Sequence, residues 1–309
     1  MTSVRLDTWK TTLWLSARAK TTPSLHRWLT SLLHDEVAAL DRLASRFRAD
    51  SELSAVNAAA GRWTEVSWDF VTVLSASLNG ASATGGLVDP LLGRQLVAAG
   101  YDRWAGQDSG VAAADTESDQ LAVGHAAAWE SIEIRPGGGQ ARVRIPQRTA
   151  LDLGAVAKGW LADRVAKIAH TSTGFDVVAN MGGDLRVISP GAMWTVAADP
   201  DIPGVEPCAM DAHDVGMATS SVGHRAWAGG HHIIDPRTGR PAETCWDSVS
   251  VLAAEAAGAN AASTASLILG HDGPAWCHGM GLDGWFVSRT SSQPVGAWPV
   301  EREHVAARA

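Results

Sequence analysis

The hydrophobic positions of the first hundred residues repeat mainly with helical spacing. After a strand-like opening, leucine and valine recur every three or four positions over residues 25–43, and Thr22-Pro23 supplies a cap and a first-turn proline. This pattern predicts a long amphipathic helix and places Trp28 in the core. Two further helices are predicted, one around residues 70–78 and one over residues 90–100.

The second half of the chain changes to alternating hydrophobic and polar positions. Residues 131–136 and 141–146 alternate on either side of three glycines, which predicts a hairpin. The remaining predicted elements are helices over 154–169 and 259–269, strands at 175–180, 184–189, 194–199, 248–254 and 284–288, and a hairpin over 231–241. Strands and helices are interspersed without regular βαβ order. The sequence therefore predicts an α+β fold with mixed or antiparallel sheets flanked by helices.

Neither internal repeats nor a clear linker interrupt the 309 residues, so we expect a single compact domain over residues 1–309. The segment 106–125 is rich in glycine, alanine, aspartate and serine, which predicts a loop insertion. No stretch approaches the ~20 apolar residues of a membrane helix, and the N-terminus shows neither signal peptide nor lipobox, so the expected location is cytoplasmic.

Composition excludes several classes of protein. With 46% hydrophobic and 19% charged residues the chain can build a packed core, and a net charge of −8 without a basic cluster gives no reason to expect a nucleic-acid partner. Cys208, Cys245 and Cys277 lack CxxC spacing and are interpreted as free thiols in a reduced compartment. The aromatic residues are unusual, because 14 Trp stand against 4 Phe and 1 Tyr.

Two glycine-containing segments are candidates for binding an anion. Residues 151–159 contain an acid, a turn that begins with glycine, and Lys158, all at the start of a predicted helix. Free N–H groups and the helix dipole favour the binding of phosphate at such a position. The alternative is that Gly154 serves the turn alone and that Lys158 is a solvated surface residue. Residues 180–184 (Asn-Met-Gly-Gly-Asp) allow close backbone approach to a ligand, or form an ordinary tight turn capped by Asp184.

Histidine and amide side chains supply further candidates. His231 and His232 are adjacent in a predicted strand and point to opposite faces, which argues against a shared metal and leaves one of them free to move protons in a pocket. Asn260 and Thr264 are one helical turn apart, so both can reach one cation. The alternative is that these two side chains satisfy each other or the backbone.

These segments and their order resemble the ApbE family of flavin transferases. The resemblance covers most of the chain apart from residues 106–125 and the two termini. It rests on residues 45–57 (SRFRADSELSAVN), 88–90 (VDP), 152–159 (DLGAVAKG), 180–184 (NMGGD), 218–220 (ATS), 232–241 (HIIDPRTGRP) and the helix with Asn260 and Thr264.

The resemblance implies a fold related to the T-fold and an activity. Family members use FAD and a divalent metal, usually Mg²⁺ with Mn²⁺ as the alternative, to transfer FMN to a Thr or Ser hydroxyl of an acceptor protein, with release of AMP. It implies that the Ala155 carbonyl, Asn260 and Thr264 bind the metal, and that Asp152 and Lys158 lie against the phosphates and ribose, with Lys158 also catalytic. The other implied flavin-nucleotide contacts are Trp9, Phe47, Leu87, Val88, Asp89, Arg225, His232 and Ile233.

His232 is also the candidate for relaying the acceptor proton, with Asp235 fixing its turn. The chain departs from the family pattern at several positions. Asn260 stands where the family has Asp, which removes a negative charge that Mg²⁺ prefers. Phe47 replaces the usual Tyr, Trp9 lies in place of a Met, and Ser221 replaces a glycine. Two alternatives to an active transferase therefore remain: a FAD-binding protein or weak FAD pyrophosphatase with a degenerate metal site, and a structural protein that binds no flavin.

Overall fold

The structure is a computed structural model that describes residues 1–101, 128–223, 225–227 and 230–299. Its centre is an eight-stranded sheet in which every neighbouring pair is antiparallel. The strands, in spatial order, are β1 (Thr2–Thr8), β2 (Thr11–Ala17), β6 (Val177–Met181), β7 (Asp184–Ile188), β10 (Gly216–Ser221), β15 (Ser248–Ala253), β16 (Asp283–Val287) and β17 (Ser292–Val295). The predicted α+β class and antiparallel sheet are confirmed.

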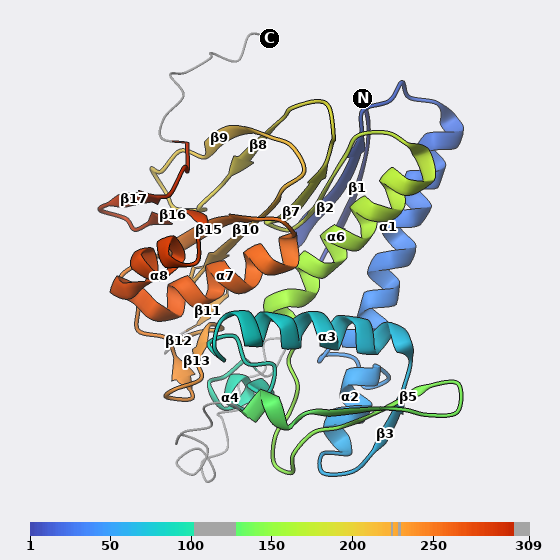
Figure 1. Cartoon of the computed structure of the whole chain (residues 1–309), viewed down its shortest axis with the longest axis vertical. Coiled ribbons are helices and arrows are strands. Elements are labelled where there is room, and N and C mark those ends of the chain that lie inside the picture. Colours follow the sequence, from blue (N-terminus) through green and yellow to red (C-terminus); the bar gives the residue numbers. More distant parts are fainter. Residues whose placement is uncertain (102–127, 224, 228–229, 300–309) are drawn as a thin grey trace.

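Three helices cover one face of this sheet (Figure 1). They are α1 (Pro23–Ala44), α6 (Gly154–Thr173) and α7 (Ala256–Leu269). Leu13 and Leu15 of β2 are fully buried against this helical layer, together with Leu33 and Leu161. The helices predicted from residues 25–43, 154–169 and 259–269 are therefore confirmed within a few residues at each end.

The prediction that Trp28 lies in the core is wrong. Its side chain is 36% exposed, whereas Leu29, Leu33, Val37 and Leu40 form the buried row of α1. One residue turns a helix by about 100°, so Trp28 lies at the border of the apolar face although it fits the spacing.

The opposite face of the sheet is covered by a two-stranded ribbon of β8 (Trp194–Ala198) and β9 (Cys208–Ala212). Successive side chains of a strand point to opposite faces, and β6 shows this alternation. Val177 and Ala179 pack in the helical core, whereas Val178 packs in the core beneath the ribbon. Both faces of the central strands are therefore buried, which accounts for their nearly continuous hydrophobic sequence.

The lower part of the molecule in Figure 1 carries the helices α2 (Glu52–Ala58), α3 (Trp68–Ala83) and α4 (Gly93–Ala98). A small sheet in the order β3 (Thr64–Val66), β5 (Ala141–Arg144) and β4 (Glu133–Pro136) lies beside them, and η1 (Ala128–Ser131) precedes it. The hairpin predicted over residues 131–146 and the helix around 70–78 are confirmed. The predicted insertion 106–125 lies outside the described residues.

Short elements complete the C-terminal half. The ribbons are β11 (Ala226–Trp227) with β12 (Gly230–His231) and β13 (Ile234–Asp235) with β14 (Arg240–Pro241), and η2 (Gly270–Asp272) and α8 (Gly273–Gly279) follow α7. Gly159 lets α6 approach the start of α7, because a Cβ at this position would lie 2.6 Å from the carbonyl oxygen of Ala256. Among the described residues, no helix combines the length and apolarity needed to cross a membrane.

Candidate functional site

A cavity of about 570 Å³ opens between the start of α6, one face of α7 and the end of β10, a size typical of small-molecule sites. Every residue predicted to contact flavin nucleotide or metal lines it. From the N-terminal half these are Trp9, Phe47, Leu87, Val88 and Asp89, and from the C-terminal half Asp152, Ala155, Lys158, Arg225, His232, Ile233, Asn260 and Thr264. Segments that are far apart in sequence thus meet around one space.

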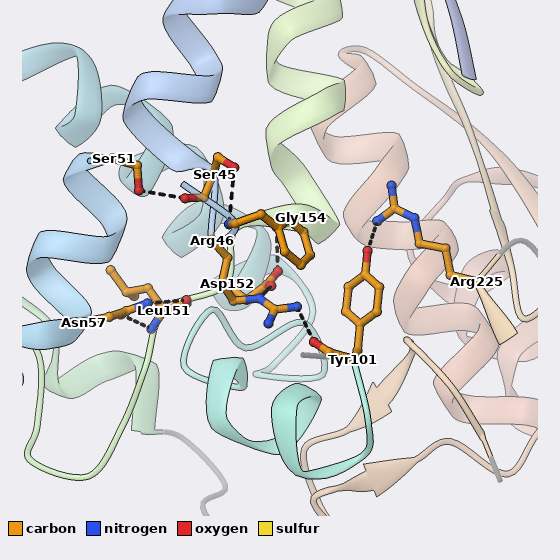
Figure 2. A network of polar contacts seen from close by, with 10 residues as sticks. Ser45, Arg46, Ser51, Asn57, Tyr101, Leu151, Asp152, Gly154 and Arg225 are labelled. Carbon is orange, nitrogen blue, oxygen red and sulfur yellow. Dashed lines mark hydrogen bonds and ion pairs between the residues drawn. The ribbon is translucent and has the colours of Figure 1, made fainter. Parts of the chain in front are cut away.

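The start of α6 is held in place by the first of the family-like segments (Figure 2). Asp152 accepts a hydrogen bond from the backbone N–H of Gly154 through Oδ1 and pairs through Oδ2 with Nε of Arg46, at 2.8 Å in each case. The amide of Asn57 forms two hydrogen bonds with the backbone of Leu151: Oδ1 accepts from its N–H, and Nδ2 donates to its carbonyl. The turn before α6 is therefore fixed from both sides, with the helix N-terminus open to the cavity.

Lys158 is partly exposed but not free, because it pairs with a buried carboxylate. Its Nζ donates to Oδ2 of Asp184 at 2.8 Å and to the carbonyl of Gly182 at 3.3 Å. The alternative in which Asp184 caps the glycine turn is wrong, because Oδ1 of Asn180 accepts the N–H groups of both Gly182 and Gly183. Gly182 and Gly183 have φ values of 70° and 97°, which explains why glycine is required at both positions.

His231 and His232 have different surroundings, as predicted, and only His232 of the two lines the cavity. His231 bonds to backbone through both ring nitrogens, with Nε2 near the carbonyl of Ala242 and Nδ1 accepting from Ile233. His232 lines the cavity, and its Nδ1 is buried without a hydrogen-bond partner among the described residues. Burial, reinforced by the positive charge of Arg225, lowers the pKa of His232 to about 3. Its imidazole is therefore neutral at physiological pH.

The turn that carries His232 is fixed by Asp235. This buried carboxylate accepts the backbone N–H of Arg237 and forms a bidentate pair with the guanidinium of the same residue. The N–H of Gly239 bonds to the carbonyl of Asp235 and closes the turn. The structure thus supplies the turn-fixing contacts that the sequence assigned to Asp235.

Leu87, Val88 and Asp89 line the cavity after the end of α3. The loop is held by Thr84, whose hydroxyl accepts the N–H of Val88, and by Asp89, whose Oδ1 accepts the N–H of Leu91. Ile233 is buried and lines the same cavity. Leu87, Val88 and Ile233 form an apolar wall of the cavity next to the buried carboxylate of Asp89.

Asn260 and Thr264 lie on the face of α7 that lines the cavity, and both are buried. Thr264 Oγ1 is 3.0 Å from the hydroxyl of Ser220, so the two predicted ligands do not satisfy each other. Among the described residues the side chain of Asn260 has no hydrogen-bond partner, although its backbone carbonyl accepts from Ser263. The amide of Asn260 thus faces the cavity with its hydrogen-bonding capacity unused, which leaves it available to a ligand.

Trp9 reaches the cavity from a strained turn. Thr8 pairs with Thr11, so Trp9 and Lys10 form a two-residue hairpin loop, and both have positive φ (51° and 57°). Such turns usually contain Asn or Gly, since other side chains are disfavoured in this region. The indole Nε1 donates to Oδ1 of Asp41 at 3.2 Å and holds the ring at the cavity wall. Strain at a cavity-lining residue is typical of functional sites.

Sequence reasoning missed Arg46 and Tyr101. Arg46 joins Asp152 to the carbonyl of Tyr101, and the ring of Tyr101 packs edge-on against Phe47 with centroids 5.7 Å apart. Tyr101 is the single tyrosine of the chain. That rarity was the one signal in the sequence that pointed to Tyr101. Hydrophobic spacing could not identify this residue, because it lies in a loop after the short helix α4.

Known proteins resemble this chain in sequence and in fold. The ApbE family model matches residues 5–286. The FAD:protein FMN transferase of Treponema pallidum is 32% identical over 257 residues, which cover 75% of this chain and 68% of that protein. The ApbE protein of Thermotoga maritima has the same fold with a TM-score of 0.78 at 23% identity, covering 95% of this chain and 96% of that one. The flavinyl transferase ApbE of Pseudomonas stutzeri, in its apo form, gives 0.77 at 21% identity, covering 95% and 94%. The chain therefore belongs to the ApbE family.

Proposed function

We propose that this protein transfers FMN from FAD to a Thr or Ser hydroxyl of an acceptor protein and releases AMP. The observation that carries the proposal is the single cavity in which all thirteen predicted binding residues meet. The relatives named FAD:protein FMN transferase support the same activity.

The cavity offers different chemistry to each part of FAD. Trp9 and Phe47 provide aromatic surfaces for the isoalloxazine ring. Lys158 and Arg225 provide positive charge for the pyrophosphate, and the N-terminus of α6 adds the positive end of its helix dipole. The apolar wall formed by Leu87, Val88 and Ile233, with Asp89 as the polar group, suits adenine.

The transfer requires a proton acceptor beside the attacking hydroxyl. In the proposed step the acceptor oxygen forms a bond to the phosphorus of the FMN half, and the bond from this phosphorus to the AMP oxygen breaks. We assign the hydroxyl proton to His232, because this neutral imidazole lines the cavity and its Nδ1 has no hydrogen-bond partner among the described residues. Lys158, held by Asp184, stabilises the charge that develops on the phosphate oxygens.

A divalent cation would be held by Asn260 and Thr264, with the carbonyl of Ala155. Oxygen donors fit a hard cation such as Mg²⁺ or Mn²⁺, and the unpartnered amide of Asn260 fits a ligand. All three donors are neutral, so most of the balancing negative charge has to come from the phosphates of FAD. When bound, the metal supplies Lewis-acid stabilisation of these phosphates.

The test uses intact-mass spectrometry of an acceptor. Purified protein, FAD and Mg²⁺ are incubated with an acceptor carrying a Thr/Ser flavinylation segment, and we expect the acceptor to gain one FMN moiety while AMP appears. A Thr/Ser→Ala acceptor is the control. If FAD binds tightly but the acceptor mass stays unchanged, the transferase proposal is wrong. Release of FMN and AMP without acceptor labelling then identifies a FAD pyrophosphatase, the alternative that the neutral side chain of Asn260 favours.

A further inference from the structure

The partly buried cations of the cavity differ in how their charges are balanced. Arg46 is paired with Asp152, and Lys158 is paired with Asp184. Across the part of the chain that the structure describes, Arg225 is paired with no carboxylate, and its Nη1 donates instead to the hydroxyl of Tyr101 at 2.9 Å. A phenol oxygen therefore holds Arg225 where carboxylates hold the other two.

This difference matters because a neutral acceptor positions a cation without cancelling its charge. Guanidinium groups only donate hydrogen bonds, so the oxygen of Tyr101 accepts. Burial raises the pKa of Tyr101, which keeps the phenol protonated and neutral. Among the described residues, Arg225 is thus a partly buried cation of the cavity that no carboxylate balances, whereas Arg46 and Lys158 are each paired with one.

Tyr101 is fixed from several sides, as a positioning group has to be. Its ring stacks on Trp227 at a centroid distance of 5.9 Å with planes 5° apart, and Arg46 donates to its carbonyl. Trp227 is in turn fixed by a hydrogen bond from Nε1 to the carbonyl of Ala99. Figure 2 shows Tyr101 reaching from its backbone contact with Arg46 toward Arg225. The hydroxyl therefore has a defined position.

The guanidinium that Tyr101 holds belongs to the candidate site. Arg225 and His232 both line the cavity, and the charge of Arg225 contributes to the low pKa of His232. The rings of Tyr101 and His232 have centroids 6.2 Å apart. An anionic group bound by Arg225 would therefore lie beside the proposed proton acceptor.

We propose that Tyr101 is a positioning residue that holds Arg225 as the uncompensated cation for a phosphate group of the flavin nucleotide. This inference rests on the proposed function, since it takes a flavin nucleotide as the ligand. It predicts that the Tyr101 hydroxyl contributes to affinity for phosphorylated flavins and contributes nothing to affinity for riboflavin, which has no phosphate.

The experiment compares dissociation constants for FAD, FMN and riboflavin, measured by quenching of flavin fluorescence. Tyr101→Phe removes the hydroxyl and retains the ring that stacks on Trp227. We expect this variant to bind FAD about tenfold more weakly and riboflavin as the unaltered protein does. A parallel loss for FMN assigns the contact to the FMN phosphate, and a loss for FAD alone assigns it to the adenylate phosphate.

A double-mutant cycle separates positioning from packing. In an Arg225→Gln background, Tyr101→Phe should cause no further loss of FAD affinity, because the hydroxyl acts through the guanidinium. The inference is overturned if Tyr101→Phe leaves FAD affinity unchanged, weakens FAD and riboflavin equally, or costs the same in both backgrounds. If the unaltered protein binds no FAD, the proposed function itself fails, and the inference fails with it. FAD binding by the unaltered protein with no effect of Tyr101→Phe overturns the inference alone.

Discussion

The Nζ of Lys158 lies 2.8 Å from Oδ2 of Asp184, whose side chain is fully buried. The other oxygen of this carboxylate, Oδ1, has no hydrogen-bond partner among the described residues. Asp184 therefore depends on Lys158 for its charge balance, whereas Lys158 is partly exposed and also bonds to Gly182. The pair is asymmetric, and removing one partner has a different cost from removing the other.

We expect Lys158→Met to destabilise the protein by about 3–5 kcal/mol, because it leaves a buried, uncompensated carboxylate. Asp184→Asn should cost less, about 1–3 kcal/mol, since it replaces the charge by a neutral polar group. Denaturant unfolding measures both values, and the double variant should be more stable than Lys158→Met alone. Equal losses for the two single variants would contradict the asymmetry.

The three proposed metal donors are all uncharged, which leads to a prediction about the metal affinity of an Asn260 variant. Asn260→Asp should raise Mg²⁺ affinity about tenfold, because a charged oxygen binds this cation more strongly than an amide oxygen. Without metal the same variant should be less stable, since the new carboxylate is buried. Calorimetric Mg²⁺ titration in the presence of FAD tests the affinity, with Asn260→Ala as the variant that lacks the donor. Overlapping titrations of the native and Asp forms would show that Asn260 is not a metal ligand.

His232 makes the stability of the protein depend on pH. The folded pKa is about 3 and the ordinary pKa of histidine is 6.5, so between these values the unfolded chain binds more protons than the folded one. Stability should therefore be full above pH ~6.5 and fall on acidification toward pH 3, with a slope of up to about 1.4 kcal/mol per pH unit from this group.

The measurement is the free energy of unfolding from pH 7 to pH 4. His232→Asn should flatten the acid limb, whereas His34→Asn, at an exposed histidine of α1, should leave it unchanged. An acid limb of the same slope in His232→Asn would show that other groups cause it.

Trp9 and Trp28 provide a test variant and a matched control for flavin binding. Trp9 lines the cavity, whereas Trp28 lies on α1 and is 36% exposed. Trp9→Ala should weaken riboflavin binding about three- to tenfold through loss of stacking, and Trp9→Phe should retain most of the affinity. Trp28→Ala should have no effect. Equal affinities in Trp9→Ala and the native protein, measured by flavin fluorescence, would exclude the stacking role.

Much of the fold was predictable because local rules determine it. The buried row of α1, the alternation in β6 and the glycine-rich hairpin between β4 and β5 each follow from spacing and turn chemistry within one segment. Elements of three to seven residues such as α2, β3, β9, α8 and β17 were missed, since so few positions do not define a period.

The sequence by itself also determined several segments that line the cavity, because glycine turns, caps and paired polar residues are read within a few positions. Only the tertiary structure decided which groups meet. Arg46 and Asp152 are 106 positions apart, and Tyr101 and Arg225 are 124 apart, yet each pair forms a hydrogen bond. Local periodicity determines the face of an element but not its neighbour. The balance of charge among the described residues of the cavity, with Arg46 and Lys158 paired to carboxylates and Arg225 bonded to a neutral phenol, therefore arises from packing between distant segments.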